Sequence, residues 1–143
     1  MFKKLLFLVL FSATLLSAAE IKWAKDFDSA IKEAAKQNKP VLFVYSRHSC
    51  KYCKLLEETT FKDEKVIKAL NRDFIAYTAY SDDGDAFPQE LWRPATPTLW
   101  FLYPTAEPMF QPLMGAVDAK NFLEALSIVM EEFKQSKTQG KEK

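Results

Sequence analysis

The stretch VLFVYSRHSCKYC, residues 41–53, decides the fold of this chain, because a short apolar segment runs almost directly into a pair of cysteines. Residues 41–45 are aliphatic and aromatic without alternation, which predicts a strand buried on both faces of a sheet. Residues 46–49 form a short polar link. The pattern that follows over residues 50–60 predicts a helix. Cys50 is therefore expected at the beginning of that helix.

The segments on either side of this stretch alternate between helical and strand patterns. Asp26 can cap a helix over residues 26–38, where apolar residues recur at helical spacing, and Pro40 prevents its continuation. The remaining elements are a helix capped by Asp63, strands at residues 74–80 and 98–103, a turn-rich loop at residues 81–85, a short helical turn at residues 89–93, an edge strand at residues 109–115 interrupted by Pro112, and a final helix capped by Asp118. This order predicts a three-layer α/β domain.

Length and composition limit the chain to one folded domain. It has 143 residues, of which 48% are apolar and 14% aromatic, and these can fill a sizeable core. Twenty Lys and Arg against nineteen Asp and Glu give a net charge of +1, which lacks the basic excess of a nucleic-acid-binding protein. Two cysteines and one histidine exclude a self-contained four-ligand zinc site of Cys and His.

The N-terminal residues have the order of an export signal. Lys3 and Lys4 precede an almost wholly apolar stretch at residues 5–16, and small residues at positions 17–19 supply a cleavage site. The apolar stretch is shorter than the ~20 residues that a spanning helix needs, so we expect a cleaved signal rather than a membrane anchor. The mature protein is then expected in an oxidising compartment, the periplasm if the source is a Gram-negative bacterium, without stable membrane insertion.

The expected organisation has three parts. A signal peptide occupies residues 1–19, a folded domain residues 20–134, and a polar tail residues 135–143. The tail lacks periodic apolar residues, so we expect it to be unstructured.

The spacing of the two cysteines carries the chemistry. Positions i and i+3 at a helix start come to one side, so Cys50 and Cys53 can close a small disulfide ring. Cys50 meets the unpaired N–H groups and the positive end of the helix dipole, which favour a thiolate. Cys53 lies one turn inside, where greater burial suits a thiol that resolves a mixed disulfide. His48 and Lys51 can tune the pair by adding positive charge near Cys50.

Two other interpretations of the cysteines stay open at this point. One is a fixed structural disulfide in an exported domain. The other is a metal site of His48, Cys50 and Cys53, which would need a carboxylate as fourth ligand. The residues favour a reactive dithiol without a metal, because a strand pattern precedes the pair and a helical pattern follows it.

Two motifs resemble a known family. Cys50-Lys51-Tyr52-Cys53 at a helix start, and Thr96-Pro97-Thr98 before an apolar strand, resemble the thioredoxin fold with its redox motif and its cis-proline. The resemblance covers residues 21–133. Within the superfamily, the sequence is similar in pattern to exported thioredoxin-like proteins and to the C-terminal domain of the membrane reductant transporter DsbD. It implies a thioredoxin fold, a three-layer α/β/α domain with a central mixed sheet.

The resemblance also implies roles for individual residues. Cys50 would attack the substrate disulfide and Cys53 would resolve the mixed disulfide. Pro97, with Thr96 before it, would back onto the dithiol and help to dock an extended substrate peptide. Tyr52, between the cysteines, is a candidate for redox tuning, and together with Thr96 it is also similar to disulfide isomerases of the DsbC type.

One position departs from the family pattern. Cytosolic thioredoxins usually carry a buried Asp six positions before the first cysteine, and this chain has Val44 there. That Asp handles the proton of the resolving thiol. We expect Glu57 or a water molecule to substitute for it, because Glu57 lies one turn after Cys53 and i, i+4 side chains share a helix face.

The sequence therefore predicts an exported thiol:disulfide oxidoreductase that acts in the direction of reduction. It is expected to need no cofactor beyond its own redox-active disulfide, Cys50–Cys53. Expected partners are protein thiols and disulfides, with a membrane transporter of the DsbD type as electron donor. The alternatives are a disulfide oxidant or isomerase, and a non-catalytic thioredoxin-like module that binds a metal or a peptide.

Overall fold

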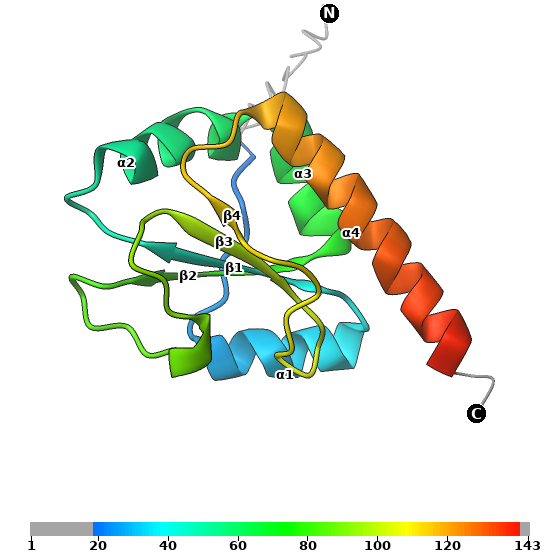
Figure 1. Cartoon of the computed structure of the whole chain (residues 1–143). Coiled ribbons are helices and arrows are strands. Elements are labelled where there is room, and N and C mark those ends of the chain that lie inside the picture. The colour runs from blue at the N-terminus through cyan, green and yellow to red at the C-terminus, as the bar shows by residue number, and fades with distance from the viewer. Residues whose placement is uncertain (1–18, 141–143) are drawn as a thin grey trace, which may run out of the picture.

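The computed structural model describes residues 19–140, so the expected signal peptide lies outside the described residues except for its last position. The elements, in chain order (Figure 1), are α1 (Phe27–Gln37), β1 (Val41–Ser46), α2 (Lys51–Glu58), the 3-10 turn η1 (Thr60–Lys62), α3 (Glu64–Asp73), β2 (Ile75–Tyr80), the 3-10 turn η2 (Gln89–Leu91), β3 (Thr98–Leu102), β4 (Leu113–Met114) and α4 (Ala119–Gly140).

The strand β1 is an interior strand of a four-stranded sheet with the order β2-β1-β3-β4. It pairs in parallel with β2 and antiparallel with β3, and β3 pairs antiparallel with β4. Every residue of β1 is buried, as a strand covered on both faces requires. The predicted central strand and mixed sheet are confirmed. Ser46, expected in the polar link, instead ends β1, because it continues the register with Tyr80.

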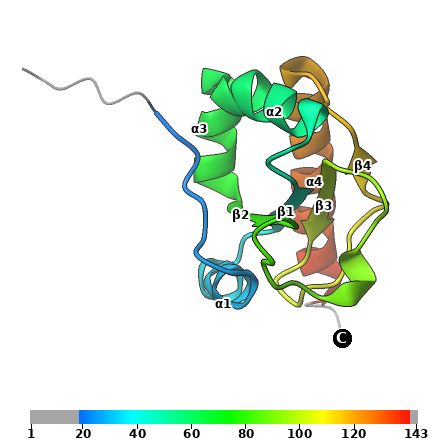
Figure 2. The ribbon, with the colours of Figure 1, turned by 90° about the vertical axis from the view of Figure 1, so that its left-hand side faces the viewer.

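Side chains alternate along β1 between two cores. Leu42 and Val44 belong to a core that also contains Phe122 of α4 and side chains of α2 and α3. Phe43 and Tyr45 belong to the core on the opposite face, which α1 covers. Two views at right angles show α1 on one side of the sheet and α2 and α3 on the other (Figures 1 and 2). The predicted three-layer α/β arrangement is confirmed.

Three of the helices begin at an aspartate whose side chain caps the first turn. Asp26 accepts an N–H of the first turn of α1 at 2.7 Å, and Asp63 and Asp118 do the same for α3 and α4 at 2.9 and 3.0 Å. Such side chains satisfy amides that have no partner inside the helix. Cys50 takes the capping position of α2 with extended backbone, so the expected helix start is confirmed.

The edge strand is shorter than predicted. Strand β4 contains only Leu113–Met114, whereas an edge strand interrupted by Pro112 was expected over residues 109–115. Pro112 has no N–H to donate and interrupts the ladder. Outside β4, the pairing reduces to isolated contacts such as the hydrogen bond from the Met109 N–H to the Phe101 carbonyl, at 2.9 Å.

The C-terminal residues also differ from the expectation of an unstructured tail at residues 135–143. Helix α4 continues through Gly140, and residues 141–143 lie outside the described part. Lys137 anchors this end, because its ammonium donates to the Asn38 carbonyl at 3.2 Å and lies 4.3 Å from the centroid of the Phe133 ring. Extension of an existing helix also costs less than nucleation of a new one.

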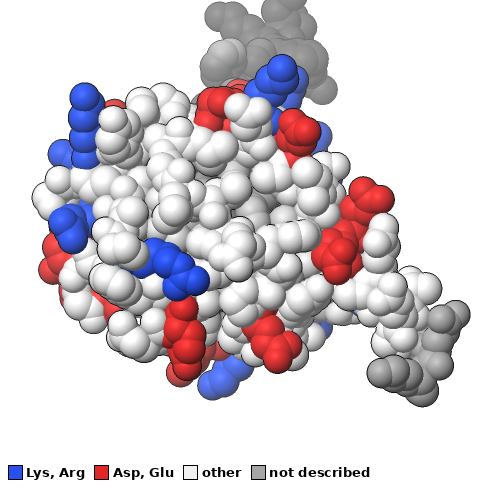
Figure 3. All heavy atoms as spheres, viewed as in Figure 1, with Lys and Arg blue, Asp and Glu red and all other residues white. Residues whose placement is uncertain are grey.

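Within residues 19–140, no helix has both the length and the apolar character needed to cross a bilayer. On the face shown in Figure 3, Lys and Arg are interspersed with Asp and Glu around the rim, and the centre, over β4 and its flanking segments, is uncharged. Two large apolar side chains in the chain segment of β4, Phe110 and Met114, are 39% and 63% exposed.

Candidate active site

Cys50 and Cys53 form a disulfide at the beginning of α2, with their Cα atoms 5.2 Å apart. Cys50 is partly exposed, whereas Cys53 is 1% exposed. The Cys53 N–H points at the Cys50 sulfur, with N and Sγ 3.1 Å apart. When the disulfide is reduced, this amide and the helix dipole stabilise a thiolate on Cys50. Cys50 is thus the more accessible of the two cysteines, and Cys53 is shielded from solvent.

The loop before β3 lies against Cys50. The Thr96-Pro97 peptide bond is cis, the conformation that the resemblance implies for this position. The Cys50 sulfur lies 3.5 Å from the Thr96 carbonyl oxygen. The Pro97 carbonyl in turn accepts the Gly115 N–H at 2.9 Å, so the segment at β4 holds this loop. The structure therefore brings together the cysteines and the proline that the sequence placed far apart.

Exposed side chains of α2 surround Cys50 on its other side. Tyr52 is 58% exposed and Lys51 is exposed beside it. A hollow of about 510 Å³ adjoins the disulfide and is lined by Ser49, Cys50, Lys51, Lys54, Leu55 and Glu58. Tyr52 therefore presents its ring to solvent, where an incoming chain can touch it.

His48 does not turn to the cysteines. Its Nε2 lies 2.7 Å from an oxygen of Asp83, and its ring stacks on Tyr80 with centroids 4.0 Å apart and planes at 8°. The hydrogen bond to Asp83 raises the pKa of His48 above its ordinary value. The main electrostatic partner of a protonated His48 is therefore the Asp83 carboxylate rather than Cys50.

The loop that leads to Cys50 is fastened to the loop after β2. The Asp82 carboxylate accepts the N–H of His48 at 2.9 Å and the N–H of Ser49 at 3.3 Å. Arg47 donates its Nε–H to the Ser81 hydroxyl at 3.3 Å. Three consecutive residues before Cys50 are thus bonded to the segment that follows β2.

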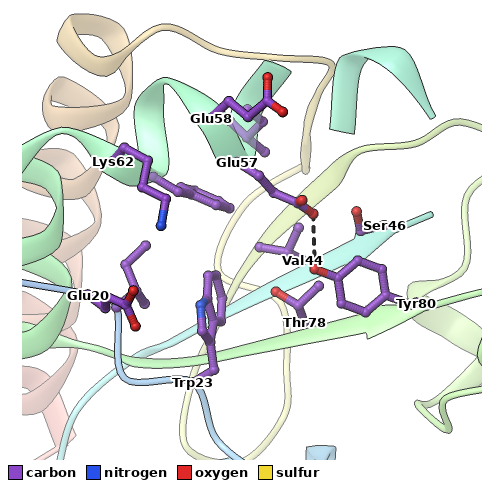
Figure 4. A pocket seen from close by; sticks show the side chains of 12 residues that line it. Glu20, Trp23, Val44, Ser46, Glu57, Glu58, Lys62, Thr78 and Tyr80 are labelled. Carbon is purple, nitrogen blue, oxygen red and sulfur yellow. Dashed lines mark hydrogen bonds between the residues drawn. The ribbon is translucent and has the colours of Figure 1, made fainter. Parts of the chain in front are cut away.

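Glu57 enters a pocket of about 340 Å³ between α2 and the sheet (Figure 4). Its Oε1 accepts the hydroxyl of Tyr80 at 3.0 Å. Val44, the position of the missing acid, lines the same pocket, as do the side chains of Ser46 and Thr78. The carboxylate therefore reaches the space near Val44 from the helix, one turn after Cys53, instead of from the strand. Burial and the Glu57 carboxylate raise the pKa of Tyr80 to about 12.

The structure also bears on the alternative of a metal site formed by His48, Cys50 and Cys53. Both sulfurs are joined in the disulfide, so in this state they are not thiolate ligands beside His48. Ligand atoms of His48, Asp82 and Asp83 lie within 4.8 Å of one another. These exposed groups already bond to one another and to backbone amides, which accounts for their proximity.

Sequence reasoning missed Tyr80, Asp82 and Asp83, because it treated them as the end of a strand and a turn. One available signal was topological. Parallel strands end at the same edge of a sheet, so the loops that follow β1 and β2 lie side by side. The acidic run after β2 could therefore have been placed beside the residues that precede Cys50.

Comparison with known proteins agrees with this geometry. The sequence model of the thioredoxin-like domain family matches residues 27–129 of this chain. A thioredoxin from Thermus thermophilus superposes with a TM-score of 0.65 and 25% identity, over 78% of this chain and 88% of that one. The oxidised C-terminal domain of DsbD from Neisseria meningitidis gives a TM-score of 0.55 and 21% identity, over 70% of this chain and 90% of that one.

A curated relative matches a shorter segment. Anterior gradient protein 3 of Mus musculus is 29% identical over 56 residues, which cover 39% of this chain and 34% of that protein. The match thus spans about a third of the relative's length.

Proposed function

Because this chain belongs to the thioredoxin-like domain family, we propose that it reduces disulfide bonds in other proteins with its Cys50–Cys53 dithiol. The fold and the disulfide support thiol:disulfide oxidoreductase activity in general. The direction of electron flow, the residue roles, the partners and the location are what the proposal adds.

The unequal placement of the two sulfurs carries the proposal. The Cys50 thiolate attacks one sulfur of a substrate disulfide, forms a mixed disulfide and releases the other sulfur as a thiolate. The Cys53 thiolate then attacks the Cys50 sulfur, which restores the internal disulfide and releases the second substrate thiolate. Two electrons pass to the substrate, and its thiolates take up protons. In this scheme Cys50, which is partly exposed, meets the substrate, and Cys53, which is buried, acts afterwards.

The second step needs a proton acceptor, and we assign it to Glu57. Cys53 must lose its proton before it can attack. Glu57 is one helical turn further along α2 and sends its carboxylate into the pocket beside Val44. A carboxylate there can take the proton that the family's strand-borne Asp usually takes.

The substrate is proposed to dock as an extended chain across the surface that joins Cys50 to the segment of Thr96 and Pro97. Exposed Tyr52 borders this surface on one side. Met114, 63% exposed on the edge strand β4, borders the other, because the segment of Gly115 is bonded to Pro97. Exposed apolar side chains around a reactive sulfur suit contact with the apolar residues of a protein substrate.

Reduction rather than oxidation is proposed because the sequence is similar to reductant-relay domains. In this scheme a membrane transporter of the DsbD type supplies electrons, and oxidised proteins of the same compartment receive them. Export follows the signal pattern of residues 1–19, and the periplasm is the corresponding location. Cell fractionation and N-terminal sequencing of the mature protein test this part.

The decisive experiment is the reduction potential of the Cys50–Cys53 pair, measured in glutathione or dithiothreitol buffers by alkylation of free thiols. A value close to the about −270 mV of thioredoxin supports a reductase, and one close to the about −120 mV of DsbA makes the protein an oxidant. A disulfide that does not exchange at all contradicts the proposal and leaves a binding module. Repair of scrambled disulfides in a refolding assay would instead identify an isomerase.

Trapping identifies the partners. Cys53→Ser keeps the attacking sulfur and removes the resolving one, so mixed disulfides with substrates are expected to accumulate on Cys50. Cys50→Ser is the matched control and is expected to trap little. Absence of the transporter from the trapped species would remove it from the scheme.

A further inference from the structure

We propose that Tyr80 is a positioning residue for the resolving step, holding the Glu57 carboxylate where it can take the proton of Cys53. This inference rests on the proposed function. It assigns a role to a strand residue that belongs to neither the cysteine motif nor the proline loop.

Tyr80 restrains a side chain that is otherwise free to move. A Glu on a helix surface has several rotamers, and many of them point to solvent. The 3.0 Å hydrogen bond from the Tyr80 hydroxyl selects a rotamer in which the carboxylate points into the pocket above Val44 (Figure 4). Because this bond uses Oε1, the second oxygen stays available for a proton.

Tyr80 is itself held from three sides. Its N–H donates to the Asp85 carboxylate at 2.9 Å, and its backbone is in register with Ser46 of β1. The ring of His48 stacks on the Tyr80 ring, and Asp83 holds His48 in turn. Since His48 belongs to the loop that leads to Cys50, one tyrosine ties that loop and Glu57 to the same strand.

Other ionisable groups face the same space. Glu20, Glu58 and Lys62 line the pocket together with Glu57. On the side of Tyr80, the neighbouring charges are those of Asp83, Asp85 and His48. The hydroxyls of Ser46 and Thr78 complete the polar lining. Among the hydrogen bonds of the described residues, the one that the Glu57 carboxylate accepts comes from the Tyr80 hydroxyl. Removal of this hydroxyl therefore tests the effect of that single hydrogen bond.

The test separates attack from resolution. Reduced protein is mixed with Ellman's reagent, an aromatic disulfide, in a stopped-flow instrument between pH 5 and pH 9. Attack by Cys50 releases the first thionitrobenzoate in a bimolecular phase, and attack by Cys53 releases the second in a unimolecular phase. Tyr80→Phe keeps the ring that supports His48 and removes only the hydroxyl.

Tyr80→Phe is expected to slow the unimolecular phase by about tenfold near neutral pH, the lower range for loss of a hydrogen bond to a charged group. The bimolecular phase is expected to stay unchanged, and the pH profile of the slow phase is expected to move towards that of Glu57→Gln. In the double variant, Tyr80→Phe is expected to add nothing to Glu57→Gln, because it acts through that carboxylate.

The matched control is Tyr77→Phe, in the same strand but on the opposite face of the sheet, where the hydroxyl is 3.5 Å from the Ala86 carbonyl. It is expected to leave both phases unchanged. Additive effects in the double variant, or a Tyr80→Phe profile equal to wild type, would overturn the role of Tyr80. A slow phase that does not respond to Glu57→Gln overturns it as well, whereas absence of thionitrobenzoate release in the wild type contradicts the proposed function itself.

Discussion

The imidazole of His48 lies flat on the phenol ring of Tyr80, with ring centroids 4.0 Å apart and planes at 8°. His48 lies in the loop that follows β1, and Tyr80 is the last residue of β2, so the stack joins the ends of two parallel strands. On the outer side, Asp83 bonds to His48, and on the inner side, Tyr80 bonds to Glu57. The Asp83 carboxylate at the surface is therefore linked through two rings to the Glu57 carboxylate in the pocket between α2 and the sheet.

We predict that Asp83→Asn lowers the pKa of His48 towards its ordinary value near 6.5. The hydrogen bond to Asp83 is the main cause that raises this pKa, and the charges of Asp83, Asp82 and Glu57 add to it. His48 is the chain's one histidine, so a proton NMR titration of its ring follows a single signal. Asp28→Asn, on α1 at the far side of the sheet, is the control and is expected to leave the titration unchanged.

The same shift fixes the sign of a pH effect on stability. A pKa that folding raises means that the folded protein binds the proton more tightly. The His48–Asp83 pair therefore stabilises the fold fully below the unfolded pKa of about 6.5, and this contribution is lost as the pH rises through the raised value. Urea unfolding at several pH values checks this, and a wild type whose pH dependence equals that of His48→Gln would contradict it.

In the reduced protein, we predict that iodoacetamide modifies Cys50 much faster than Cys53. Cys50 is partly exposed and receives the Cys53 amide, whereas Cys53 is 1% exposed. Thiolate character and access both govern the rate of alkylation, and both favour Cys50. Peptide mass spectrometry after short exposure measures the ratio. Equal labelling of the two cysteines would contradict the distinct roles proposed for them.

Asp82→Ala is predicted to loosen the approach to Cys50 without unfolding the domain. The carboxylate accepts the amides of His48 and Ser49, and without it these N–H groups exchange with water more readily. Hydrogen exchange followed by NMR is expected to show faster exchange at these two amides and unchanged exchange in β1. Uniformly faster exchange would indicate global destabilisation instead.

Phe122→Ala is predicted to lower the free energy of unfolding by about 3–5 kcal/mol, because a fully buried aromatic side chain leaves a cavity when it is removed. Phe122 joins α4 to the core that contains Val44. Phe110→Ala, at a side chain that is 39% exposed, is the matched control and is expected to cost much less. Urea denaturation measures both.

The sequence allowed prediction where the causes are local. Asp26 caps a helix through a neighbour three residues away, and the apolar run of β1 signals burial by itself. By contrast, Glu57 and Tyr80 are 23 residues apart, and His48 and Asp83 are 35 residues apart. These contacts exist only once the parallel register of β1 and β2 is set, and no residue spacing in the chain encodes that register.

The end of α4 and the shortness of β4 were missed for related reasons. The continuation of α4 depends on a lysine that reaches the carbonyl of Asn38, 99 residues earlier in the chain. The extent of β4 depends on which backbone groups Pro112 leaves unpaired. By composition the end of α4 is polar and the segment of β4 is apolar, but tertiary contacts determine where each element ends.

The capping atom of α2 is also the atom that undergoes the chemistry. The Cys53 amide donates to the Cys50 sulfur, and that sulfur is a weak acceptor in a disulfide but a strong one as a thiolate. Reduction therefore strengthens this capping hydrogen bond, and oxidation weakens it while joining the two residues covalently. The helix end that favours the thiolate is in turn stabilised by the negative charge of that thiolate, so the strength of the helix cap follows the redox state of the cysteines.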